Sequence, residues 1–167
     1  SFLLHNLRYD HSLKLALVSS VLKPQVCILQ KESIRQGFRP DAFITTDKNT
    51  PLSSDSPFGI YKALTELQIY PIKTVVHIAD TVEGIQSGLN AGCWTIGVSR
   101  YSTLMDIHNR MHENTLLESQ LEKRTQCVRD KLRGAGAHYV VTELTDLSVI
   151  IRTINDRLYE GDTPISH

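Results

Sequence analysis

The segment HIADTVEGIQSGLNAGCWTIGV, residues 77–98, holds the clearest fold signal in the chain. The apolar run at residues 73–79 predicts a buried strand, and residues 81–90 predict a helix for which Asp80 is a suitable N-cap. The apolar run at residues 93–98 predicts the next strand. A strand, a helix and another strand in this order are typical of a βαβ unit with parallel strands.

The same alternation extends over the rest of the chain. We expect a short amphipathic helix at residues 1–12 and a loop at residues 48–56. We expect further strands at residues 14–20, 42–45 and 138–141. We expect further helices at residues 24–36, 57–68, 115–133 and 144–158. The sequence therefore predicts an α/β core with a parallel sheet in residues 1–160, followed by a frayed tail at residues 161–167.

The composition argues against several classes of protein. The 167 residues include 18 Lys and Arg against 18 Asp and Glu, and this balance argues against a nucleic-acid partner. No apolar run reaches the roughly 20 residues that span a bilayer, so no membrane association is expected. We recognise no secretory signal, and the three cysteines do not suggest a disulfide framework, so we expect a cytoplasmic location.

Two strand ends carry side chains suited to phosphate chemistry. Ligands of open α/β sheets bind beyond the carboxyl ends of the strands. The Asp80 carboxylate at such an end could hold magnesium against a phosphate, or it could simply cap the following helix. Glu83 lies one turn further on the same helical face and is a weaker candidate. Ser19 could donate a hydrogen bond to a phosphoryl oxygen, or it could be an ordinary turn serine.

The histidines give little functional signal. His108 and His112 have helical spacing, but the segment is polar and suggests solvated side chains. His77 lies inside an apolar strand and is expected to be a core histidine. The glycine-rich motifs of nucleotide-binding loops are absent from the sequence.

Four stretches of the chain resemble phosphonoacetaldehyde hydrolases, the phosphonatase branch of the haloacid-dehalogenase (HAD) superfamily. They are GFRPDAFITTDKNTP at residues 37–51, YKALTELQIYP at 61–71, residues 77–98, and GAGAHYVVTELTDL at 134–147. The resemblance runs from about Leu13 to Asp156 and implies a three-layer, HAD-like Rossmannoid fold with a parallel sheet. It implies that the chain corresponds to the C-terminal core portion of the family.

The resemblance also implies roles for individual residues. Ser19 matches the phosphoryl-binding Ser or Thr of the family, and Asp80 matches its first magnesium carboxylate, so Mg²⁺ and a small phosphonate or phosphate are the implied ligands. The family's nucleophilic aspartate and its Schiff-base lysine belong to a strand and a cap domain that precede the matched region. No residue of this sequence therefore matches a catalytic position.

Three positions depart from the family pattern. The expected basic position reads Ser53-Ser54-Asp55, the glycine before the magnesium aspartate is Ala79, and the second acidic position is Gly84, next to Glu83. Three hypotheses follow. The chain is the core of a phosphonate or phosphate hydrolase whose catalysis is impaired or lost, or it is a non-catalytic scaffold that binds a partner, as the departures suggest. The third hypothesis is an incomplete gene product with no role as a free chain.

The resemblance has a consequence for the sheet as well. The family's nucleophile strand is central, between the strands expected at residues 14–19 and 73–79. Without it, each of these strands has an unpaired inner edge, which is a site for association. Either the two strands close on each other, or another polypeptide or a second copy completes the sheet, or the chain is incomplete.

Overall fold

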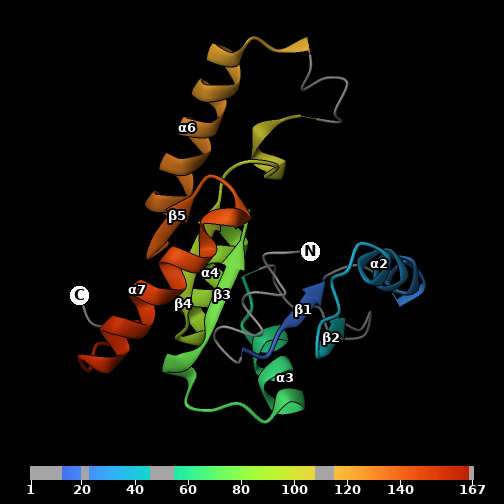
Figure 1. Ribbon diagram of the computed structural model, residues 1–167, viewed down its shortest axis with the longest axis vertical. Coiled ribbons are helices and arrows are strands. Elements are labelled where there is room, and N and C mark those ends of the chain that lie inside the picture. The colour runs from blue at the N-terminus through green and yellow to red at the C-terminus, as the bar shows by residue number, and fades with distance from the viewer. Residues whose placement is uncertain (1–12, 20–22, 46–54, 108–114, 166–167) are drawn as a thin grey trace.

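The computed structural model of the protein describes residues 13–19, 23–45, 55–107 and 115–165 (Figure 1). The helix expected at residues 1–12 and the two histidines His108 and His112 lie outside these ranges. Most of the loop expected at residues 48–56 also lies outside them.

The described strands form two parallel sheets. β1 (Ala16–Ser19) pairs with β2 (Ala42–Thr45), with Ala16 opposite Ala42. β3 (Val76–Ala79), β4 (Trp94–Val98) and β5 (Tyr139–Val141) form the second sheet in that order. All the pairings are parallel, so the expected α/β class with a parallel arrangement is confirmed.

Helices connect the strands as the alternation predicts. They are α2 (Lys23–Arg35), α3 (Phe58–Leu67), α4 (Val82–Ala91), α6 (Glu118–Gly134) and α7 (Leu147–Tyr159). Short 3₁₀ turns lie at Ile72–Thr74, Thr103–Met105 and Leu144–Asp146. Gly37 has a φ of 84° just after α2, a conformation that favours glycine and ends the helix.

Strand β4 forms the centre of the core because it has neighbours on both sides and on both faces. Trp94, Ile96 and Val98 pack on one face against α7, mainly against Ile151 and Ile154. On the other face, Gly97 lies so close to α6 that an added Cβ atom would be 3.0 Å from Leu132 Cδ1. The result is a layer of α7, a sheet, and a layer of α4 and α6.

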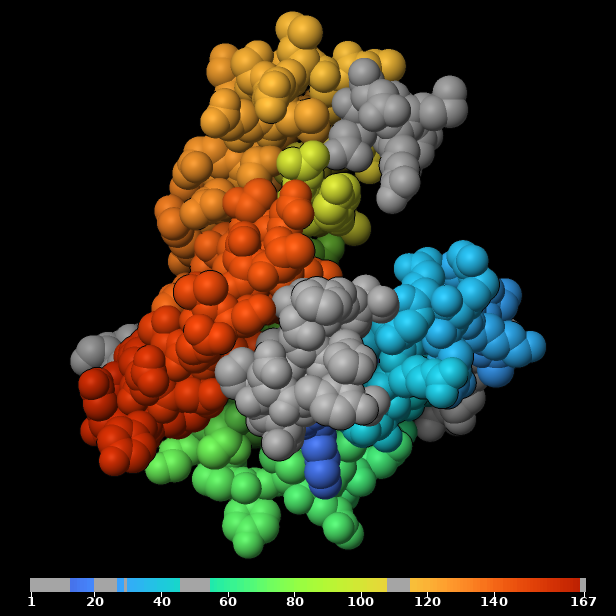
Figure 2. All heavy atoms as spheres, in the orientation of Figure 1, coloured from blue at the N-terminus to red at the C-terminus, as the bar shows by residue number. Residues whose placement is uncertain are grey.

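Helix α3 joins the two sheets. It packs against β1 and β2 and also against α4. Hydrogen bonds support this junction: Ser87 Oγ donates to the Ser56 carbonyl over 2.8 Å, and Asn90 Nδ2 donates to the Asp55 carbonyl over 3.1 Å. Figure 2 shows that α6 extends at one end well beyond the rest of the molecule.

The residues after α7 contact α7 itself and the residue that precedes β5. The Asp162 carboxylate accepts a 2.9 Å bond from Arg157 Nε, and the Pro164 carbonyl lies 2.7 Å from His138 Nε2. The division into residues 1–160 and 161–167 stays a prediction.

Candidate functional site

The helix after β3 begins one residue later than expected. Thr81, not Asp80, is the N-cap of α4: its backbone is extended, and its Oγ1 accepts a 3.1 Å hydrogen bond from the Gly84 amide. The expectation that Asp80 caps the helix is therefore wrong. The physical reason is that the side chain of Thr81 already occupies the capping position, because its hydroxyl oxygen accepts the hydrogen bond from the Gly84 amide.

Asp80 is tied instead to the loop that follows β4. Its Oδ2 atom accepts a 3.3 Å bond from the Thr103 amide, and its carbonyl accepts a short bond from the Ser102 hydroxyl. Ser102 is buried and also caps the turn at Thr103–Met105. The end of β3 is thus held to the end of β4, with a half-buried carboxylate at the edge of the sheet.

The start of α4 lies unusually close to the end of β3. A Cβ atom added to Gly84 would be 2.7 Å from the Cβ atom of Ala79 and 3.0 Å from Thr81 Oγ1. Two Cβ atoms do not approach this closely without a shift of the backbone. The side chain at position 79 therefore excludes one at position 84.

This packing bears on the magnesium site that the resemblance implies. Asp80 is a suitable oxygen ligand, but Gly84 provides none, and Glu83 is exposed on the next position of the helix. Among the described residues, no cluster of three or more His, Cys, Asp or Glu side chains could hold a metal ion. The described residues around Asp80 do not fit a tightly bound magnesium.

Ser19 lies in a different sheet from Asp80. It ends β1 opposite Thr45 of β2, while Asp80 follows β3 of the three-stranded sheet. Of the expected basic stretch, only Asp55 lies in the described part, and its carbonyl accepts from Asn90. The fold therefore brings Asp80 and Glu83 to one sheet edge and leaves Ser19 on the other sheet.

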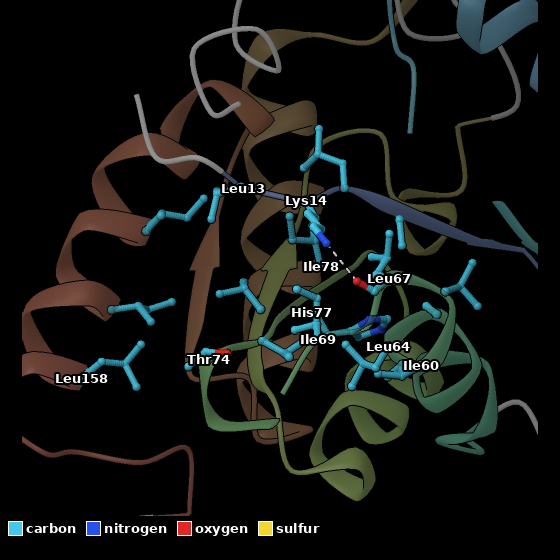
Figure 3. A pocket seen from close by; sticks show the side chains of 18 of the residues that line it. Leu13, Lys14, Ile60, Leu64, Leu67, Ile69, Thr74, His77, Ile78 and Leu158 are labelled. Atoms are coloured by element: carbon cyan, nitrogen blue, oxygen red, sulfur yellow. Dashed lines mark hydrogen bonds between the residues drawn. The ribbon is translucent and has the colours of Figure 1, made fainter. Parts of the chain in front are cut away.

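A cavity of about 480 Å³ separates β1 from β3, and we call it the inter-sheet cavity (Figure 3). It is lined by β1, β3, α3 and α7 and by the segments that flank the two strands, and most of its lining side chains are apolar. Lys14 lies at its rim and donates from Nζ to the Leu67 carbonyl at the end of α3 over 3.0 Å. Among the described strands, β1 does not pair directly with β3, which was one of the three outcomes expected for the unpaired edges.

His77 also lines the inter-sheet cavity and packs against α4. Burial lowers the pKa of its imidazole below the usual value of 6.5, and a backbone hydrogen bond with Gly84 opposes part of this effect. The expected role of His77 as a core histidine agrees with this placement. A neutral ring suits the apolar surroundings.

A second, more open cavity of about 970 Å³ was missed by the sequence reasoning. It lies between α6 and the loop after β4 and includes Arg100 and Arg129. Both guanidinium groups have partners there: Arg129 Nη1 donates to Thr142 Oγ1 over 2.8 Å, and Arg100 Nε lies 3.6 Å from a carboxylate oxygen of Glu143. No local sequence signal marks this cavity, because its walls come from distant segments.

Within the described part of the chain, none of the helices combines the length and the apolar composition needed to cross a membrane. The described cysteines Cys27, Cys93 and Cys127 are all free thiols.

Comparison with known proteins identifies the family. No protein-family model matches the chain. A phosphonoacetaldehyde hydrolase of Syntrophobacter fumaroxidans is 32% identical over 154 residues, which is 92% of this chain and 55% of that protein. One from Paraburkholderia phytofirmans is 36% identical over 132 residues, 77% of this chain and 48% of that protein.

A solved structure shares the fold. The phosphonoacetaldehyde hydrolase like protein of Oleispira antarctica matches 98% of this chain and 58% of its own, with a TM-score of 0.89 and 24% identity. The chain thus spans about half the length of the relatives that it matches. Its parallel α/β fold and these similarities place the chain among the phosphonoacetaldehyde hydrolase-like proteins of the haloacid-dehalogenase superfamily.

Proposed function

We propose that the chain is the core portion of a phosphonate or phosphate monoester hydrolase, and that residues 1–167 by themselves are catalytically impaired. In this proposal Ser19 binds phosphoryl oxygens, and Asp80 at the end of β3 is the carboxylate that would hold magnesium against them. The relatives' names support the substrate class, and the location of Asp80 at the carboxyl edge of a parallel sheet is where such ligands bind.

The observation that carries the impairment is the contact between positions 79 and 84. Position 84 carries no carboxylate, and a side chain introduced there would meet the Ala79 Cβ atom, so Asp80 and the exposed Glu83 are the two carboxylates at this edge. Magnesium supplies charge neutralisation in phosphoryl transfer when it is bound. With one well-placed carboxylate we expect it to bind weakly.

The test measures phosphate release from phosphonoacetaldehyde together with thermal unfolding across a magnesium titration. We expect no turnover above that of the Asp80→Asn variant and no saturable rise in Tm, because a ligand stabilises only a state that it binds. Glu66→Gln, which removes an exposed carboxylate on α3, is the matched control. Turnover and a saturable rise in Tm, both lost in Asp80→Asn and kept in Glu66→Gln, would contradict the proposed impairment.

The second candidate is a non-catalytic scaffold that binds a partner. The inter-sheet cavity favours it, because two strand edges with apolar walls are a binding surface for polypeptide. Both candidates give no phosphate release from residues 1–167 alone. They differ when the chain is combined with the part of a relative that it does not match, because only a hydrolase core then contributes to turnover that Asp80→Asn lowers.

A further inference from the structure

The second, more open cavity lies at the carboxyl end of the three-stranded sheet, and we call it the α6 cavity. One wall is a stripe of residues along α6, and the other is the loop after β4, whose 3₁₀ turn packs against α6 (Figure 1). Thr142, the residue directly after β5, also lines it. Ligands of open parallel sheets bind beyond such strand ends. The α6 cavity shares no lining residue with the inter-sheet cavity.

Backbone hydrogen bonds hold the ends of β4 and β5 together at the α6 cavity. The Ser99 amide donates to the Val141 carbonyl over 3.0 Å. Ser99 is buried, and its hydroxyl donates to the same carbonyl over 3.2 Å. The Arg100 amide donates to the Thr142 carbonyl over 2.9 Å. The backbones of Arg100 and Thr142 are therefore fixed next to each other at the edge of the cavity.

Arg129 brings a second guanidinium group to the same point from α6. Its Nη1 atom donates to Thr142 Oγ1 over 2.8 Å. A guanidinium group carries five N–H donors, of which this bond uses one, and the hydroxyl that accepts the bond keeps its own proton to donate. Arg129 and Thr142 therefore position each other and still have hydrogen atoms to donate to a ligand.

The guanidinium group of Arg100 adds a second positive charge. It lies 5.5 Å from the centre of the Tyr101 ring, and its Nε atom is 3.6 Å from a carboxylate oxygen of Glu143. The side chains of this ion pair are 38% and 43% exposed, so solvent screens it and it contributes little. The pair with Glu143 therefore does not prevent Arg100 from binding an anion.

The loop that carries Arg100 has an unusual backbone at the next residue. Tyr101 has a φ of 67°, a left-handed conformation that is uncommon for residues other than glycine. Its side chain is 70% exposed, so burial of the ring does not explain the conformation. Residues held in this way cluster at ligand-binding and catalytic sites. The backbone of Tyr101 is thus an independent indication that the loop is functional.

The other end of the α6 cavity is acidic. Glu118 and Glu122 line it from the first turns of α6, and Glu122 precedes Arg129 by two turns, about 10 Å along the helix axis. A long polyanion would extend over both ends and meet these carboxylates. A single anion of phosphate size avoids them by binding beside the arginines.

We propose that the α6 cavity binds a small tetrahedral oxyanion, inorganic phosphate or a phosphonate, between Arg100, Arg129 and Thr142. These donors come from the ends of β4 and β5 and from α6, and three directions suit the outer oxygens of a phosphoryl group better than a planar carboxylate. The site includes neither Ser19 nor Asp80. The inference therefore goes beyond the proposed function and does not depend on catalysis.

The experiment titrates the isotope-labelled 167-residue chain with inorganic phosphate, methylphosphonate or acetate and follows the NMR spectrum. Chloride keeps the ionic strength constant, because salt screens exposed charges. We expect saturable shifts of the Arg100 and Thr142 amides and of the Arg129 Nε–H group with phosphate and with methylphosphonate. Acetate is expected to bind more weakly than either.

Three variants locate the site. Arg129→Gln should weaken phosphate binding by about tenfold or more, because hydrogen bonds between charged groups are strong ones. Arg100→Gln should also weaken it, and it tests the site from another element if Arg129→Gln fails to fold. Arg133→Gln is the matched control: it removes the same charge from an exposed position of α6 that does not line the cavity. Its affinity for phosphate is expected to equal that of the unchanged chain.

Four results would overturn the proposal. The first is the absence of saturable shifts beyond those that chloride causes. The second is an equal loss of affinity in Arg129→Gln and Arg133→Gln, which would show general charge attraction. The third is binding of acetate as tight as that of phosphate.

The fourth result separates this inference from the proposed function. Saturable shifts confined to the ends of β1 and β3, and abolished by Asp80→Asn, would place phosphate in the site of the proposed function and leave the α6 cavity empty. Under the present inference, Asp80→Asn leaves the shifts of Arg100, Arg129 and Thr142 unchanged.

Discussion

A Cβ atom added to Gly84, near the start of α4, would lie only 2.7 Å from the Cβ atom of Ala79 at the end of β3. The packing leaves room for a side chain at only one of these two positions, and in this chain that side chain is the methyl group of Ala79. The two departures from the family pattern at Ala79 and Gly84 are thus one coupled feature. A carboxylate side chain at position 84 would require either a shift of α4 or the removal of the methyl group at position 79.

This coupling predicts a difference between two variants. Gly84→Asp alone should lower the free energy of unfolding by about 1–3 kcal/mol through overpacking. The double variant Ala79→Gly/Gly84→Asp should recover part of that loss and gain a saturable rise in Tm with magnesium. Urea unfolding and a magnesium titration measure the two effects. A single variant as stable as the unchanged chain would show that the helix can shift freely.

A second close contact predicts a packing defect between α4 and the sheet. A Cβ atom at Gly88 would be 2.6 Å from Thr95 Cγ2 and 2.9 Å from His77 Cδ2. Gly88→Ala should therefore cost about 1–3 kcal/mol in urea unfolding. Gly134→Ala is the control: nothing lies within 4 Å of the added atom there, so a helix-end alanine should be neutral or slightly stabilising. Equal effects of the two substitutions would contradict the described packing.

The buried imidazole of His77 predicts a pH dependence of stability. Its pKa is lowered in the fold, mainly by burial, so below the usual value of 6.5 the unfolded chain binds a proton that the folded chain does not. The contribution of the buried neutral imidazole to the free energy of unfolding is complete above about pH 6.5 and is lost as the pH falls towards the lowered pKa of His77. The difference in unfolding free energy between the unchanged chain and His77→Gln should therefore shrink from pH 7.5 to pH 5. A pH-independent difference would exclude this role.

The thiols should differ in reactivity. Burial raises the pKa of the Cys93 thiol to about 12, whereas Cys27 and Cys127 are exposed. Because the thiolate is the reactive form, the exposed Cys27 and Cys127 should react quickly with a disulfide reagent at pH 8, and Cys93 should react only after unfolding. Mass spectrometry of the labelled chain identifies the sites. Fast labelling of Cys93 in the folded chain would contradict its burial.

The sequence by itself determined the order of strands and helices. The expected strand at residues 42–45 coincides with β2, and the expected strands at residues 73–79 and 93–98 end at the same residues as β3 and β4. Apolar periodicity is a local property, and it suffices to assign the strands and α-helices among the described residues. It did not predict the 3₁₀ turn at Ile72–Thr74, so the strand expected from residue 73 begins only at Val76. The four stretches that resemble phosphonoacetaldehyde hydrolases were also enough to indicate the family.

Only the tertiary structure decided what surrounds these elements. Which side chain caps α4 depends on which residue has the extended backbone just before the helix, and Thr81 takes the place expected for Asp80. The exclusion between Ala79 and Gly84 depends on how closely a helix approaches a strand, which no spacing in the sequence reveals. The exposure of Val18 and Ile78 is set by which neighbours a strand finds in the sheet, because an apolar strand is buried only where another element covers it.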